Sequence, residues 1–146
     1  MSLVYLDTSV ALAHLLAEDR CPPGDLWKET LVSSRLLSYE TWVRLDAMGL
    51  RASHGEMAQD LLGRIALLEL VSPILNRAAD GFPHRLRTLD ALHLASLLFL
   101  IEQGQRVTLA SYDQRLNAAA EAMGIMPWFN GGPSPGPKSS SSNGWV

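Results

Sequence analysis

Short apolar runs alternate along this chain with longer segments in which apolar residues recur every three or four positions. The short runs are typical of buried β-strands, and the longer segments have the periodicity of helices that bury one face. Strands that alternate with helices pair in parallel through right-handed crossovers. The pattern therefore predicts an α/β fold, a three-layer α/β/α sandwich with a central, mainly parallel sheet.

The apolar runs predict four strands, at residues 3–6, 31–37, 106–110 and 125–129. The segments of helical periodicity predict helices, at residues 10–16, 25–30, 39–48, 56–70, 74–78, 90–102 and 113–122. Gly55 is expected to interrupt the chain before the helix at 56–70. Because the segment 90–102 is apolar on most of its surface, it should lie at the centre of the fold.

The composition fits one globular domain followed by a polar tail. The 146 residues are 47% hydrophobic and 18% charged, enough to bury a core. We expect that domain over residues 1–129 and a disordered tail over 130–146, which is mostly Gly, Pro and Ser. Since we find neither a membrane-spanning apolar stretch nor a signal-peptide pattern, we expect a cytoplasmic protein without membrane contact.

The charge pattern limits how the protein can bind nucleic acid. A net charge of -3 gives no overall attraction for phosphate chains, so such binding would depend on locally placed arginines. Arg85 and Arg87 lie just before Asp90, and Arg44 lies one turn after Glu40. These three arginines are therefore candidates for binding RNA phosphates. The alternative is that each is solvated or pairs with a neighbouring carboxylate.

Four acidic residues fall at or just after predicted junctions between elements: Asp7, Glu40, Asp90 and Asp113. Asp7 directly follows a predicted strand and Asp113 lies three residues after another, where open parallel sheets present ligands, although each could simply cap the next helix. Glu40 could simply pair with Arg44. Asp90 opens an apolar helix, where an unpaired charge is costly.

Gathered at one sheet edge, these carboxylates would repel one another unless a cation lay between them. Their oxygens are the ligands that Mg²⁺ and Mn²⁺ prefer. Thr8 and Ser111 are predicted to support them by binding water or by orienting the aspartates. His93, three positions after Asp90, is interpreted as a core histidine with a backbone or hydroxyl partner.

Four segments carry a resemblance to a known family. They are Tyr-Leu-Asp-Thr-Ser at 5–9, Ser-Arg-Leu-Leu-Ser-Tyr-Glu at 34–40, Leu-Asp-Ala-Leu-His-Leu-Ala at 89–95 and Ser-Tyr-Asp at 111–113. With these motifs in this order, the chain resembles the PIN-domain family over residues 1–129, and more narrowly VapC-type toxins. The motif around Asp90 is the most specific.

The resemblance implies a Mg²⁺- or Mn²⁺-dependent endoribonuclease, typically a homodimer, that a VapB-like antitoxin inhibits by inserting a segment into the active groove. Carried over, Asp7, Glu40, Asp90 and Asp113 become the catalytic, metal-binding acids, with Asp7, Asp90 and Asp113 as the principal ligands. A metal in such a site makes a bound water nucleophilic and neutralises charge on the phosphate that is cleaved.

Two other functions fit parts of the pattern. A phosphoryl-transfer module of receiver or haloacid-dehalogenase type also places an aspartate after the first strand and uses Mg²⁺, and it would phosphorylate Asp7. Such sites normally need a lysine near a later strand end, whereas the chain's two lysines are Lys28, in a polar segment, and Lys138, in the tail. A non-catalytic binding domain is the third interpretation, which the intact set of carboxylates disfavours.

Overall fold

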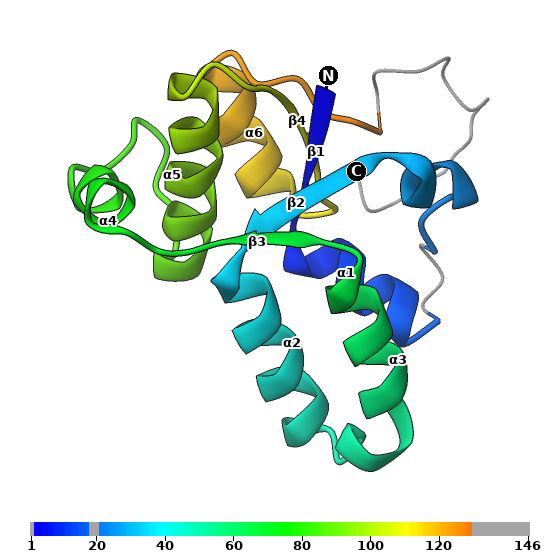
Figure 1. The fold of residues 1–146 in the computed structure, drawn as a ribbon. Coiled ribbons are helices and arrows are strands. Elements are labelled where there is room, and N and C mark those ends of the chain that lie inside the picture. Colours follow the sequence, from blue (N-terminus) through cyan, green and yellow to red (C-terminus); the bar gives the residue numbers. More distant parts are fainter. Residues whose placement is uncertain (1, 18–20, 130–146) are drawn as a thin grey trace.

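The computed structural model describes residues 2–17 and 21–129 (Figure 1). The predicted tail, residues 130–146, lies outside the described residues. None of the described helices is long and apolar enough to cross a membrane.

A parallel sheet of four strands forms the centre of the molecule. The strands are β1 (Ser2–Leu6), β2 (Thr30–Ser34), β3 (Ala66–Leu68) and β4 (Arg106–Ala110), and their order in the sheet is β3-β2-β1-β4. β1 pairs with β2 on one side and with β4 on the other, so that Tyr5 stands opposite both Val32 and Leu109. The predicted parallel sheet is confirmed.

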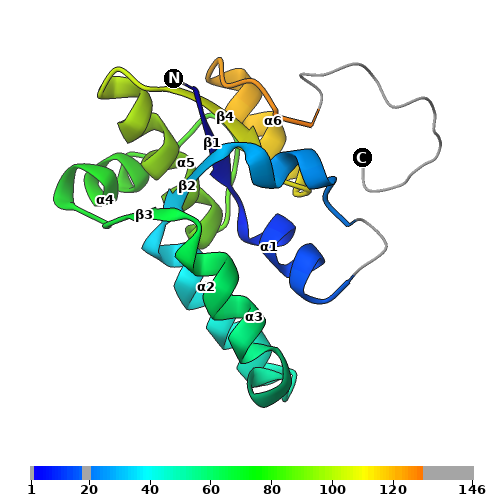
Figure 2. The ribbon, with the colours of Figure 1, turned by 45° about the vertical axis from the view of Figure 1, so that its right-hand side comes forward.

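Helices cover both faces of this sheet (Figures 1 and 2). Besides the short 3-10 helix η1 (Gly24–Lys28), they are α1 (Thr8–Leu15), α2 (Arg35–Ala47), α3 (Arg51–Gly63), α4 (Ser72–Ala79), α5 (Thr88–Glu102) and α6 (Gln114–Ala122). Figure 2 shows α2 and α3 side by side, extending away from the sheet.

The side chains of β1 alternate between two cores. Val4 and Leu6 belong to a buried cluster with residues of α1, α2 and α3, whereas Leu3 and Tyr5 belong to a second cluster with residues of α5 and α6. Successive residues of a strand point to opposite faces of a sheet, so a strand that is apolar throughout must be covered on both. The predicted three-layer sandwich is therefore confirmed.

The predicted helix at 56–70 is wrong at both ends. α3 begins at Arg51 and passes through Gly55, which lies beside the Trp42 ring of α2 and does not break the chain. Residues 66–68 form β3, which pairs with β2. Pairing with a neighbouring strand outweighs local preference in so short a segment.

The predicted strands at 31–37 and 125–129 also differ from the structure. β2 ends at Ser34, whose hydroxyl accepts a hydrogen bond from the Leu36 backbone at 3.2 Å and so caps α2. In the second segment, Leu109 bonds the backbone of residues 126 and 128, giving a single parallel bridge at Pro127. These bonds use the C=O of residue 126 and the N–H of residue 128, so Pro127, which has no N–H, is tolerated at this edge of the sheet.

Candidate active site

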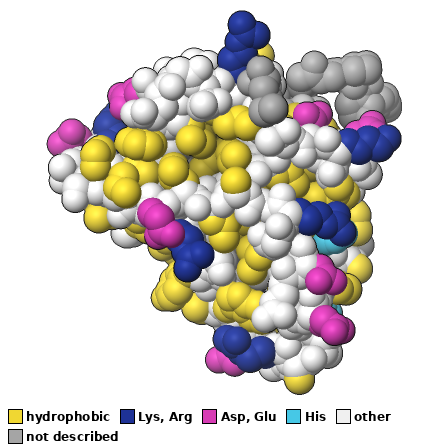
Figure 3. Space-filling model, viewed as in Figure 1, with side chains coloured by type: hydrophobic (Ala, Val, Ile, Leu, Met, Phe, Trp, Pro, Cys, Tyr) yellow, Lys and Arg dark blue, Asp and Glu magenta, His cyan; other side chains and the backbone are white. Residues whose placement is uncertain are grey.

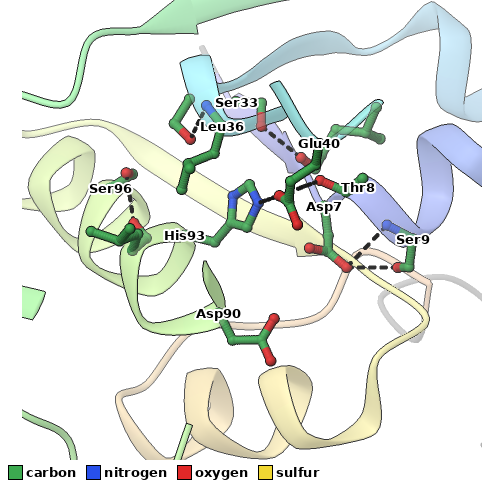
Figure 4. Close-up of polar contacts among 12 residues, drawn as sticks. Asp7, Thr8, Ser9, Ser33, Leu36, Glu40, Asp90, His93 and Ser96 are labelled. Atoms are coloured by element: carbon green, nitrogen blue, oxygen red, sulfur yellow. Dashed lines mark hydrogen bonds and ion pairs between the residues drawn. The ribbon is translucent and has the colours of Figure 1, made fainter. Parts of the chain in front are cut away.

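The four predicted acids come from four elements that meet at the carboxyl end of the sheet. Asp7 directly follows β1, and Asp113 lies three residues after β4. Asp90 lies in the first turn of α5, and Glu40 lies in α2, which follows β2. In Figure 4 the side chains of Asp7, Glu40 and Asp90 approach one another from separate elements. This end of the sheet is where open α/β folds bind ligands.

Asp7 is buried and uses only one of its oxygens for structure. Its Oδ2 accepts hydrogen bonds from the backbone N–H of Ser9 at 3.3 Å, from the Ser9 hydroxyl at 2.6 Å and from the Ser111 hydroxyl at 2.9 Å. Asp7 is thus the N-cap of α1, which is the alternative role that the sequence left open. Within the described residues, Oδ1 has no hydrogen bond, so this oxygen stays available to a ligand.

Asp113 has a similar arrangement after β4, the strand that lies beside β1 in the sheet. Its Oδ1 accepts from the backbone N–H groups of Arg115 and Leu116 at 2.9 and 3.2 Å and caps α6. Its Oδ2 lies 3.7 Å from a guanidinium nitrogen of Arg87. The Ser111 hydroxyl, which donates to Asp7, also accepts from the Asp113 backbone N–H at 2.9 Å. The predicted supporting residue Ser111 therefore links two of the acids.

Asp90 is the acid in the least favourable surroundings. Its side chain is 13% exposed, and its buried Oδ2 has no hydrogen-bond partner among the described residues. Burial, together with the negative charges of Asp113 and Asp7, raises the pKa of Asp90 to about 6, although Arg87 and His93 oppose this. The negative charges of Asp113 and Asp7 therefore both disfavour the charged form of Asp90.

Arg87 partly neutralises this charge from the solvent side. Its exposed guanidinium lies 3.6 Å from Asp90 Oδ2 and 3.7 Å from Asp113 Oδ2. Arg85 lines a hollow of about 420 Å³. The other residues that line this hollow are His84, Gln114, Arg115 and Ala118. Arg44 is exposed on α2, and among the described residues it forms no ion pair with Glu40.

Glu40 is held by two hydrogen bonds to the same oxygen. Thr8 donates its hydroxyl to Oε1 at 2.7 Å, and Nε2 of His93 also lies 2.7 Å from Oε1. Figure 4 shows Glu40 between Thr8 and His93. On the other side of the imidazole, Nδ1 of His93 lies 2.8 Å from the hydroxyl of Tyr5. The prediction that His93 is a core histidine with a hydroxyl partner is confirmed, but its bond to Glu40 was not predicted.

The surroundings of His93 favour its charged form. Burial alone would lower the pKa of His93, but the Tyr5 oxygen, the hydrogen bond to Glu40 and the charges of Asp7 and Glu40 raise it to about 10. The sequence signal for this link was the spacing of His93 from Asp90. Residues three apart share one face of a helix, so the face of α5 that presents Asp90 also presents the imidazole.

The carboxylates fit a hard divalent cation that also retains water ligands. No three His, Cys, Asp or Glu side chains in the described part of the chain are arranged to hold a metal ion by themselves. Mg²⁺, however, is usually bound through one or two carboxylates and several waters. Oδ2 of Asp90, which has no hydrogen bond among the described residues, is one carboxylate oxygen available to such an ion, and the charges of Asp7 and Asp113 lie near it. Neutralising that charge would remove the repulsion between them.

Comparison with known proteins agrees with this geometry. A family model described as PIN domain matches residues 4–122. Ribonuclease VapC46 from Mycobacterium tuberculosis (strain ATCC 25618 / H37Rv) is 29% identical over 130 residues, which cover 86% of this chain and 95% of the relative. Ribonuclease VapC47 from Mycobacterium tuberculosis (strain CDC 1551 / Oshkosh) is 26% identical over 130 residues, 85% of this chain and 94% of the relative. No solved structure matches significantly.

Proposed function

Because the chain belongs to the PIN domain family, we propose that it is a metal-dependent endoribonuclease, the toxin of a VapBC-type toxin–antitoxin pair. The relatives named as VapC ribonucleases support this proposal across most of the chain. The observation that carries it is Asp90, a half-buried carboxylate whose Oδ2 has no hydrogen bond among the described residues and which lies near the charges of Asp113 and Asp7. Carboxylates whose charged form is this unfavourable gather at functional sites, where a bound cation can compensate for their charge.

In this proposal three acids bind the metal and the fourth orients the attacking water at the phosphate that is cleaved. Asp7, Asp90 and Asp113 would hold Mg²⁺ or Mn²⁺ directly or through its water ligands, with the oxygens of Asp7 and Asp113 that do not cap a helix and with Oδ2 of Asp90. A cation held there would supply a nucleophilic water and neutralise charge on the phosphate. Glu40 accepts a hydrogen bond from water and so orients it for in-line attack. Thr8 and Ser111 keep Glu40 and Asp7 in place through their hydroxyls.

Three arginines are the proposed contacts of this chain with an RNA strand. Arg87 bridges Asp90 and Asp113, so a cation bound to these carboxylates would free its guanidinium for a phosphate. Arg85 and Arg115 line one hollow beside Asp113, and no carboxylate lines it among the described residues. Arg44 is exposed on α2, one turn after Glu40. We propose that Arg87, Arg85 and Arg44 bind RNA phosphates.

The proposed partners are RNA, a VapB-like antitoxin and a second copy of this chain in a homodimer, all in the cytoplasm. Apolar side chains on the surface would give protein partners an area to cover. Figure 3 shows apolar surface over α4 and α5, and the exposed side chains there include Leu75, Leu89 and Ile101. Contiguous apolar surface of this kind often marks an interface.

The proposal is tested by cleavage of a mixed pool of structured RNA in Mg²⁺, in Mn²⁺ and in EDTA. We expect metal-dependent cleavage by the wild type, its loss in Asp90→Asn, and its retention in Asp60→Asn, a matched change at an exposed position on α3. If wild type and Asp90→Asn cut equally, or if neither cuts while folded and free of antitoxin, the proposal fails.

That failure would make acyl-phosphate formation at Asp7 the next reaction to test, with a small phosphodonor as substrate. The structure offers this alternative little support. Lys28 is highly exposed and pairs with Asp25 in η1, at 3.4 Å. Lys138 lies outside the described residues.

A further inference from the structure

We propose that His93, braced by Tyr5, is a positioning residue that orients Glu40 for RNA cleavage. The inference rests on the proposed function and adds residues that the four acidic motifs do not include. Three elements build the chain of contacts, with Tyr5 on β1, Glu40 on α2 and His93 on α5. No segment of local sequence contains all three residues.

The imidazole is fixed from both sides in a buried position. His93 is 1% exposed, and its Nδ1 and Nε2 lie 2.8 Å from the Tyr5 hydroxyl and 2.7 Å from Glu40 Oε1. The two rings meet edge to face, with centroids 5.7 Å apart and an angle of 81° between their planes. Tyr5 is itself fully buried in the sheet. The ring can therefore neither turn nor withdraw without breaking a hydrogen bond in the core.

The direction of the bond to Glu40 follows from chemistry. An ionised carboxylate can only accept hydrogen bonds, so Nε2 of His93 must carry the proton that it shares with Oε1. This holds whether the imidazole is neutral, with the Tyr5 hydroxyl donating to Nδ1, or charged, with Nδ1 donating to Tyr5. The orientation of Glu40 does not depend on the protonation state of His93.

The consequence for Glu40 is that its two oxygens have different tasks. Oε1 accepts from both Thr8 and His93, while Oε2 has no hydrogen bond within the described residues. A free glutamate side chain samples many rotamers, and two donors on one oxygen hold it in one of them. Oε2 is thereby kept ready to accept a hydrogen bond from the attacking water.

A purely structural role for His93 makes a different prediction from a positioning role. Removing the imidazole leaves the buried Tyr5 hydroxyl unpaired, so a loss of stability is expected in either case. Only a positioning role also lowers kcat of the folded protein, and only through Glu40. The two roles therefore separate when kinetics are measured well below the melting temperature of each variant.

The test compares His93→Gln with His93→Leu in the metal-loaded protein. Glutamine can donate an amide N–H to Glu40, whereas leucine fills the space without a donor. We expect kcat to fall about 10- to 100-fold in His93→Leu, with little change in KM, and to recover largely in His93→Gln. The matched control is His54→Gln on α3, which should keep wild-type kinetics.

A double-mutant cycle with Glu40→Gln shows whether His93 acts through Glu40. We expect His93→Leu to lower kcat little further in the Glu40→Gln background, because the residue that it positions is already disabled. Independent effects that multiply would overturn the proposal. So would an unchanged kcat in folded His93→Leu, or failure of His93→Gln to restore activity.

A readout without metal comes from NMR of protein labelled with ¹⁵N-histidine. We expect a slowly exchanging, downfield Nε2–H signal from His93 that shifts in Glu40→Gln and disappears in His93→Gln. A rapidly exchanging Nε2–H would contradict the geometry. A wild type that cleaves no RNA would overturn the proposed function and the role of His93 in it, whereas cleavage with multiplicative effects would overturn the role of His93 alone.

Discussion

Replacing Asp90 with asparagine should stabilise the metal-free protein while abolishing cleavage. Burial and two neighbouring carboxylates raise the pKa of Asp90 from 3.8 to about 6. A difference of this size corresponds to about 3 kcal/mol at neutral pH. Because Arg87 and solvent screen the site, we expect about 1 to 2 kcal/mol of this to be recovered in Asp90→Asn. Asparagine keeps the shape of the side chain without its charge.

The pH dependence of this effect has a definite sign. An acid whose folded pKa is raised holds its proton more tightly in the folded state, so its ionisation destabilises the fold as pH rises. Near pH 4 the Asp90 carboxyl of the folded protein is neutral and wild type and variant should differ little. The advantage of Asp90→Asn should grow between pH 4 and 6 and be complete at pH 7.5.

Urea unfolding in EDTA at pH 4, 6 and 7.5 measures this difference for wild type and Asp90→Asn, with Asp60→Asn as the exposed control. Adding Mg²⁺ at pH 7.5 should then stabilise the wild type and leave Asp90→Asn almost unchanged. A variant less stable than the wild type at pH 7.5, or a difference independent of pH, would refute the reasoning. Either result would mean that Asp90 already has adequate partners.

Three further changes test other parts of the structure. Ser111→Ala should lower kcat at least about tenfold and cost about 1 to 3 kcal/mol in urea unfolding, because it removes the hydroxyl that links two acids; unchanged values would remove its supporting role. Arg85→Ala should weaken RNA binding by catalytically inactive Asp90→Asn and make the slope of log Kd against log salt concentration less steep by about one, measured by fluorescence anisotropy, while Arg106→Ala, at the end of β4 opposite the site, should not. Leu97→Ala should cost about 2 to 5 kcal/mol in urea unfolding, since Leu97 is fully buried in α5, and a smaller loss would place α5 outside the core.

Periodicity was sufficient to predict the layers but not every strand. β1 is apolar at successive positions because both of its faces are covered, and α5 is apolar on most sides because it packs on β2 and β4 as well as on α4 and α6. β3 has only three residues and continues the apolar pattern of the preceding helix. Its pairing with β2, more than thirty positions earlier, decides its conformation. A contact of that range leaves no local signal.

The site was predictable to the extent that each acid lies beside a chain junction. Asp7, Asp90 and Asp113 directly follow a strand or open a helix, and the parallel sheet brings those junctions to one edge. The partners of Glu40 were not predictable in this way. Its bond to His93 spans 53 positions and depends on how α2 and α5 pack against β1.

The capping and catalytic interpretations of Asp7 and Asp113 are compatible. A carboxylate has two oxygens, and in both residues a single oxygen serves as the helix cap, which fixes the side chain and leaves the other oxygen directed elsewhere. A cap gains free energy from this arrangement and a metal ligand gains a fixed orientation. Asp90 caps no helix, so no backbone N–H groups stabilise its charge or fix its orientation. Its raised pKa reflects the unfavourable free energy of its charged form. The repulsion at this sheet edge should therefore act mainly on Asp90, and mutations there should trade stability against activity more than at Asp7 or Asp113.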